Sequence, residues 1–94
     1  MASNKDYKDF IREQLSELNP TFKSMMGEYL IYVKGVYFGG IFDNRFLVKI
    51  TDTNIQYGLT KELPYENAKP MYLVKNIDNK DYLKSLILDT IKGL

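Results

Sequence analysis

Residues 21–50 read TFKSMMGEYLIYVKGVYFGGIFDNRFLVKI, and this stretch decides the fold. Its β-branched and aromatic residues recur with a period of two, which is typical of β-strands. The pattern predicts strands near residues 21–26, 29–33, 36–42 and 45–50. Lys34-Gly35 and Asp43-Asn44 are two-residue connectors of the kind found in tight hairpins, because glycine and asparagine tolerate positive φ. We therefore expect these strands to pair in sequence order as an antiparallel sheet.

Amphipathic helices are expected on both sides of this stretch. Before it, residues 7–18 carry an apolar stripe with helical spacing, preceded by Ser3 as a plausible N-cap and ended by Asn19-Pro20. After it, Asp78 is placed to cap a second helix whose apolar face extends over residues 82–94. Both helices have one apolar side that must be buried against the sheet.

The segment between the hairpins and the last helix has weaker signals. Residues 51–54 are expected to cap a short helix that ends at Gly58, and residues 63–67 to form a loop fixed by Pro64. Residues 71–74 read as one more strand. The sequence thus predicts a single α+β domain over residues 1–94. It has two layers, an antiparallel sheet of about five strands with the N- and C-terminal helices packed on one face, in the order α-β-β-β-β-short α-β-α.

Composition excludes several classes of function. The 94 residues contain no cysteine and no histidine, which removes disulfides, thiolate or imidazole metal sites and Ser-His or Cys-His catalysis. Thirteen basic and twelve acidic residues give a net charge of +1, so overall charge recruits neither nucleic acid nor an anionic membrane. We expect no catalytic, cofactor-binding or metal-binding residues and no enzymatic activity. The polar N-terminus and the short apolar runs predict no signal peptide, no membrane association and a cytoplasmic protein.

Two features inside the predicted sheet each allow two interpretations. Gly39-Gly40 lies within a strand, where glycine marks a bulge or the close approach of another backbone, or else borders a small-ligand pocket. The alternatives at Glu28 are a half-buried carboxylate that accepts hydrogen bonds from turn amides and a catalytic group with a raised pKa. We favour the structural interpretation in both cases.

Several segments together resemble one bacterial family. Met25-Met26-Gly27-Glu28-Tyr29 is followed by residues 39–49, GGIFDNRFLVK, and later by Leu63-Pro64-Tyr65-Glu66. In this order they are similar to the N-terminal domain of the TfoX/Sxy competence regulators, and the resemblance covers essentially the whole chain. It implies an antiparallel α+β fold. Full-length regulators of this family act in transcriptional activation of DNA-uptake genes and carry a further helical C-terminal domain, which these 94 residues do not include.

The resemblance implies a non-enzymatic regulatory or adaptor domain that binds a protein, either a transcription factor or a second copy of itself. The strand at 29–33 is apolar on both faces, so it is expected to lie centrally or to be covered by a partner. The contact residues expected on the remaining sheet face are Tyr32, Tyr37, Leu47 and Tyr72. The alternative is direct binding of nucleic acid through a basic surface of Lys34, Arg45 and Lys49, with tyrosines available for stacking.

Overall fold

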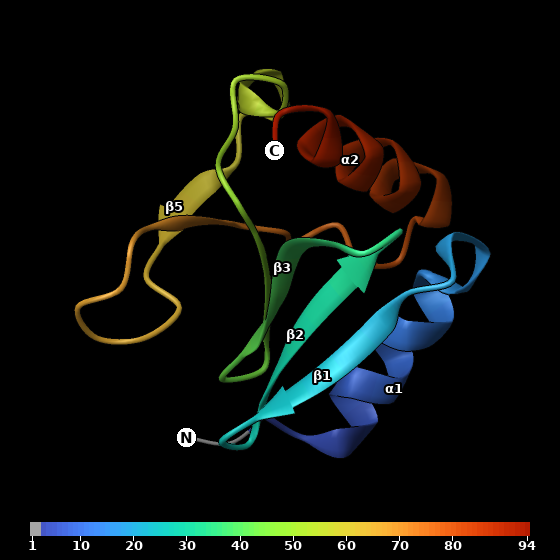
Figure 1. The fold of residues 1–94 in the computed structure, drawn as a ribbon, viewed down its shortest axis with the longest axis vertical. Helices are drawn as coiled ribbons and strands as arrows, with labels where there is room; N and C mark the ends of the chain where they lie inside the picture. Colours follow the sequence, from blue (N-terminus) through green and yellow to red (C-terminus); the bar gives the residue numbers. More distant parts are fainter. Residues whose placement is uncertain (1–2) are drawn as a thin grey trace.

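The computed structural model describes residues 3–94, which form an antiparallel six-stranded sheet with two α-helices behind it (Figure 1). The helices are α1 (Lys5–Gln14) and α2 (Lys80–Lys92), and the strands are β1 (Thr21–Met25), β2 (Glu28–Val33), β3 (Val36–Phe42), β4 (Arg45–Val48), β5 (Thr60–Glu62) and β6 (Met71–Leu73). Across the sheet the order is β1-β2-β3-β4-β6-β5. The predicted α+β class is confirmed, with one more strand than expected.

Tight turns connect the first four strands into a meander. Both central residues of each turn have positive φ, between 51° and 86°, which is the geometry whose twist matches that of antiparallel strands. These pairs are Met26-Gly27, Lys34-Gly35 and Asp43-Asn44. The two connectors expected from the sequence are therefore the turns of the structure. β2 lies inside the sheet, between β1 and β3.

Differences from the expected elements occur where the sequence signal is short. β5 has only three residues, too few to show an alternating pattern, and was not expected. The short helix before it is a 3-10 helix, Ile55–Tyr57, that ends as expected at Gly58, whose φ is 65°. Each α-helix is capped one residue later than predicted, by Asn4 and Asn79 rather than by Ser3 and Asp78. Asparagine accepts from the free amides of the first turn as well as serine or aspartate does.

The main hydrophobic core lies between the sheet and the two helices. α1 contributes Ile11 and Leu15, both essentially inaccessible to solvent. At the centre, Phe38 and Phe46 meet edge to face with ring centroids 6.4 Å apart. The remaining buried side chains of this core are Ile31, Val33, Ile41, Val48, Tyr72, Val74, Leu83, Leu86 and Ile87. This core gives the sheet a rigid back layer and leaves its other face without helical cover (Figure 1).

Gly39 and Gly40 form an irregular point in β3. The register between β2 and β3 shifts here, since Ile31 pairs with Gly39 but Tyr32 pairs with Tyr37. A Cβ on Gly39 would overlap the backbone oxygen of Leu47, and one on Gly40 would overlap that of Tyr29. The structural interpretation of this pair, a bulge with close backbone approach, is confirmed.

A buried polar network fastens the segment after β4 to α2. The Asn54 side chain is fully buried; its Nδ2 donates to Lys49 O at 2.8 Å and to Thr90 Oγ1 at 2.9 Å, and its Oδ1 accepts from Thr51 N at 3.0 Å. Thr90 Oγ1 in turn donates to Leu86 O. Every polar atom of the Asn54 amide group is thus paired, which fixes the direction in which the chain leaves β4.

Candidate functional site

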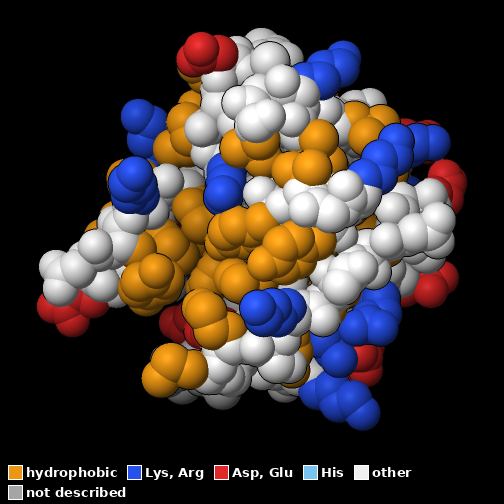
Figure 2. All heavy atoms as spheres, viewed as in Figure 1, with side chains coloured by type: hydrophobic (Ala, Val, Ile, Leu, Met, Phe, Trp, Pro, Cys, Tyr) orange, Lys and Arg blue, Asp and Glu red, His pale blue; other side chains and the backbone are white. Residues whose placement is uncertain are grey.

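The sheet face opposite the helices carries a second, smaller apolar cluster. Phe42, Leu47 and Met71 are buried in it, and Leu30 and Leu73 pack against them half-buried. Figure 2 shows this face, with hydrophobic side chains gathered in its middle and Lys and Arg side chains around them. A sheet face with an apolar centre and no helix over it has the character of a binding surface.

A groove of about 590 Å³ opens beside this cluster. Strand β3 and the residues that follow β4 form one side, and the loop between β5 and β6 forms the other. The lining residues are Tyr37, Phe42, Lys49, Ile50, Pro64, Tyr65, Ala68, Lys69, Pro70 and Met71. Its volume falls within the range of roughly 300–1,000 Å³ that ligand sites occupy.

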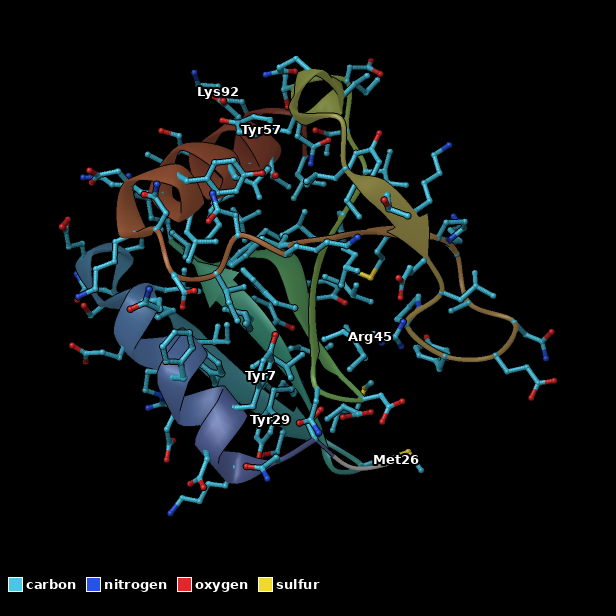
Figure 3. The ribbon with its side chains drawn as sticks, turned by 180° about the vertical axis from the view of Figure 1, so that it is seen from behind. Tyr7, Met26, Tyr29, Arg45, Tyr57 and Lys92 are labelled. Carbon is cyan, nitrogen blue, oxygen red and sulfur yellow. The ribbon has the colours of Figure 1, made fainter. Side chains whose placement is uncertain are left out.

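Arg45 holds the loop that forms one wall of the groove (Figure 3). Its Nη1 donates to Glu62 Oε1 at 2.8 Å and to Leu63 O at 3.0 Å, and its Nη2 donates to Pro64 O at 3.1 Å. Its Nε donates to Phe42 O at 3.1 Å, so the guanidinium ties the β3–β4 hairpin to the start of the loop. The planar fork of arginine suits this arrangement, because several donors point to different acceptors at once. The groove therefore depends on Arg45 for its shape.

Aromatic rings form the walls of the groove. Tyr65, 59% exposed, reaches from the loop toward Phe42, with ring centroids 6.2 Å apart. Tyr37 lies 5.6 Å from Tyr32, centroid to centroid, and the Lys49 Nζ sits 4.3 Å from the centre of the Tyr37 ring. Burial, with smaller contributions from Tyr65 and Tyr32, raises the pKa of Tyr37 above its ordinary value. The groove thus presents neutral aromatic surfaces with an ammonium group held over one of them.

The four predicted contact residues do not share one surface. Tyr32 and Tyr37 are half-buried neighbours on the open face, as expected. Leu47 belongs to the same face but is fully buried within the cluster, so it supports the surface instead of contacting a partner. The placement of Tyr72 is wrong: it is 6% exposed and lies in the core on the helix side. Tyr72 pairs with Val48, and side chains of paired residues lie on the same face of a sheet.

The residues that the sequence did not identify come mainly from the β5–β6 loop. The sequence predicts a loop over residues 63–67 that is fixed by Pro64, but it gives no position for this loop relative to β3. The sequence places Phe42 in a strand but does not show on which face of the sheet its side chain lies. The available signal was the Leu63-Pro64-Tyr65 run, since a fixed loop ending in an exposed aromatic side chain is a common binding element.

The alternative basic surface is not assembled as predicted. Arg45 uses its donors on Glu62, the loop carbonyls and its own hairpin, and its ion pair with Glu62 cancels its charge. Lys49 is placed over Tyr37, and Lys34 is exposed in the β2–β3 turn. Only the two lysines remain available to a phosphate, and phosphate-driven binding rests on several such contacts.

Glu28 has the structural role that we favoured. Its carboxylate, half-buried at the start of β2, accepts from the Ser3 hydroxyl and, at 2.9 Å, from the backbone amide of Asp43. Ser3 Oγ also accepts from the amide of Asn44 at 3.2 Å. Glu28 therefore fixes the β3–β4 turn and the approach to α1.

Within residues 3–94, no three His, Cys, Asp or Glu side chains are grouped so as to hold a metal ion, and no helix has the length and apolar character needed to cross a membrane.

Comparison with known proteins gives one informative relative. No family model matches the chain. A protein of Spirochaeta aurantia, described as an uncharacterized 12.7 kDa protein in the trpE 5' region, is 31% identical over 80 residues, which cover 82% of this chain and 70% of that protein.

Proposed function

The chain belongs to the family of this Spirochaeta aurantia protein, and we propose that it is a non-enzymatic binding domain that recognises a protein partner on its open sheet face. The observation that supports this most is the groove of about 590 Å³ between β3 and the β5–β6 loop. Two helices cover one face of the sheet, whereas the other has an apolar centre and an exposed aromatic wall. Tyrosine and other aromatic side chains are typical anchors of protein interfaces.

The similarity of the sequence to the TfoX/Sxy N-terminal domain supports a regulatory or adaptor role in transcription as part of this proposal. In such a role the domain contributes binding and no chemistry. A protein partner also fits the chemistry of the groove, since its walls are neutral aromatic and proline side chains with Lys49 and Lys69 as the charged groups.

A differential capture experiment tests the proposal. The immobilised chain is exposed to nuclease-treated lysate of its own host, in parallel with the variants Tyr65→Ser and Phe10→Ser. Both residues are exposed aromatics, 59% and 39%, but Phe10 is on α1, away from the groove. We expect at least one protein to be retained by the wild type and by Phe10→Ser and to be lost with Tyr65→Ser. Identical sets of retained proteins for all three chains would refute the proposal.

A further inference from the structure

The charges that line the groove have one sign. Among the described residues that line it, the ionisable side chains are Lys49, Lys69 and two tyrosines, and none is Asp or Glu. The nearby Glu62 is held in an ion pair with Arg45 at 2.8 Å and is thereby neutralised. Neither ammonium group is in an ion pair with a described residue, so a ligand in this groove meets two positive charges, and carboxylates are their natural complement.

The walls of the groove favour recognition through side chains. Pro64 and Pro70 line it at the two ends of the loop, and proline has no backbone N–H to offer to an added strand. Phe42 and Met71, both buried, form an apolar floor, and methionine adapts its shape to what packs on it. A large apolar side chain of a partner thus finds a floor of matching character, with Tyr65 exposed beside it.

The position of Lys49 connects the apolar and the charged parts of the groove. Its Nζ lies 4.3 Å from the centre of the Tyr37 ring, a contact that holds the ammonium group at the groove. A partner carboxylate next to the inserted apolar side chain is within the reach of such a group. Lys69 lies on the loop side and supplies the second positive charge.

From these features we infer that the partner binds through a short segment in which a large apolar side chain is flanked by Asp or Glu. This inference rests on the proposed function and names the chemistry of its partner. The apolar side chain packs on Phe42 and Met71 beside Tyr65, and the flanking carboxylates pair with Lys49 and Lys69.

Selection from a random twelve-residue peptide library displayed on phage, with the whole chain as bait, tests the inference. We expect the enriched peptides to combine an aromatic or large aliphatic residue with flanking Asp or Glu and to lose binding to Tyr65→Ser. Enriched peptides without acidic residues that still depend on Tyr65 would overturn the inferred chemistry and leave the groove as the binding site. No enrichment, or peptides that bind Tyr65→Ser equally well, would overturn both the inference and the proposed function.

Charge substitutions then measure the contribution of the two lysines. Fluorescence anisotropy with the best enriched peptide compares Lys49→Gln and Lys69→Gln with Lys84→Gln, which removes the same charge from α2 on the opposite face. We expect the first two variants each to weaken binding at least about fivefold and Lys84→Gln to leave it within about twofold, with a steep loss at high salt. Equal effects of all three substitutions would contradict the inferred pairing.

Discussion

Gly39 leaves no room for a side chain in the sheet. A Cβ there would overlap the Leu47 carbonyl oxygen and lie 2.9 Å from Val48 Cα, both backbone atoms of the neighbouring strand. We therefore expect Gly39→Ala to lower the free energy of unfolding by about 3 kcal/mol or to prevent folding, because the backbone of β4 must move.

The matched control for Gly39→Ala is Gly35→Ala in the β2–β3 turn. A Cβ on Gly35 would meet nothing within 4 Å, but its φ of +77° is strained for alanine, so a loss of about 1–2 kcal/mol is expected. Urea denaturation followed by circular dichroism measures both variants. Equal losses in the free energy of unfolding would show that the backbone of β4 moves aside for the added Cβ at little cost, which would contradict the prediction for Gly39→Ala.

Tyr57 makes the stability of the fold sensitive to alkaline pH. Burial and the hydrogen bond to Asp89 Oδ2, 2.6 Å long, raise its pKa to about 12, against about 10 in an unfolded chain. The folded state holds this proton more tightly, so the stabilisation is complete below pH 10 and is lost as the pH rises toward 12. In Tyr57→Phe we expect a smaller fall in Tm between pH 8 and pH 11 than in the wild type. An identical fall would exclude this tyrosine as a source of the pH dependence.

For some residues the sequence predicts the kind of role, whereas the partners that carry out the role are known only from the structure. The structural roles of Glu28 and of the Gly39-Gly40 pair were predicted from their places at a turn and inside a strand, although Glu28 accepts from Ser3 and Asp43, 25 and 15 residues away. Arg45 acts on a loop 17 to 19 residues further on, and no local pattern marks such a contact. Tyr72 was assigned to the wrong face because residues 71–74 are all apolar, which leaves the phase of the strand undetermined.

Among the elements, the segment between β4 and β5 depends on one buried side chain. Asn54→Ala removes the acceptor of the Thr51 amide and the donors to Lys49 O and Thr90 Oγ1. Because buried polar groups are left unpaired, we expect a loss of roughly 2–4 kcal/mol in the free energy of unfolding. Gln56→Ala is the control, since Gln56 donates one exposed hydrogen bond to Thr53 O and its loss should change stability by less than about 0.5 kcal/mol. Comparable losses in thermal denaturation would contradict this role.

We expect that the β5–β6 loop can lose its fixed position while the rest of the fold stays intact. In Arg45→Met the hydrogen bonds to Glu62, Leu63 and Pro64 are lost, while the helix-side core is untouched. We expect an unchanged far-ultraviolet circular dichroism spectrum and much faster proteolytic cleavage within residues 61–69. Arg12→Met, which removes a cation over the Phe22 ring on the other side of the sheet, should not change cleavage there. Unchanged cleavage in Arg45→Met would show that the loop is held by other contacts.

The elements could be predicted where their residues form a periodic or a continuous apolar pattern that is bounded by turn residues or helix caps. β1 to β4 and both α-helices have periodic patterns and recognisable turns, and the bounds of these four strands agree with the prediction within about two residues. The first helix is shorter than predicted, because α1 ends at Gln14 and Ser16–Leu18 form a separate 3-10 turn. β5 has three residues and is a strand because it pairs with β6, which follows the loop in the sequence. The groove could not be predicted for the same reason, because one of its two sides is formed by that loop.

On the scale of the whole molecule, the two helices come from opposite ends of the described chain and meet behind the sheet. Gln14 Nε2 donates to Ile77 O at 2.9 Å, just before α2. Lys84 Nζ forms an ion pair with Glu17 Oε2 at 3.9 Å. These contacts span more than sixty residues, whereas the β1–β4 meander is built from neighbours in sequence. Local contacts close with a smaller loss of chain entropy, so the meander is expected to form first.

Kinetic measurements on two core variants test this order. Ile31→Val removes a buried methyl group from β2, and Leu86→Ala truncates a buried side chain of α2. In stopped-flow experiments we expect Ile31→Val to slow folding and Leu86→Ala mainly to accelerate unfolding. The reason is that the packing of Leu86 against the sheet forms after the transition state. The reverse assignment would place α2 in the nucleus.

The late position of α2 in the chain has a consequence during synthesis. Ribosomes release the meander before residues 80–92, so the apolar face built from Ile31, Phe38 and Phe46 exists for a time without the helix that covers it. At about 5–20 residues per second the interval lasts a few seconds, long enough for chaperones or other nascent chains to bind that face. The same back layer that makes the mature sheet rigid is thus the surface most exposed to misassembly before the last helix emerges.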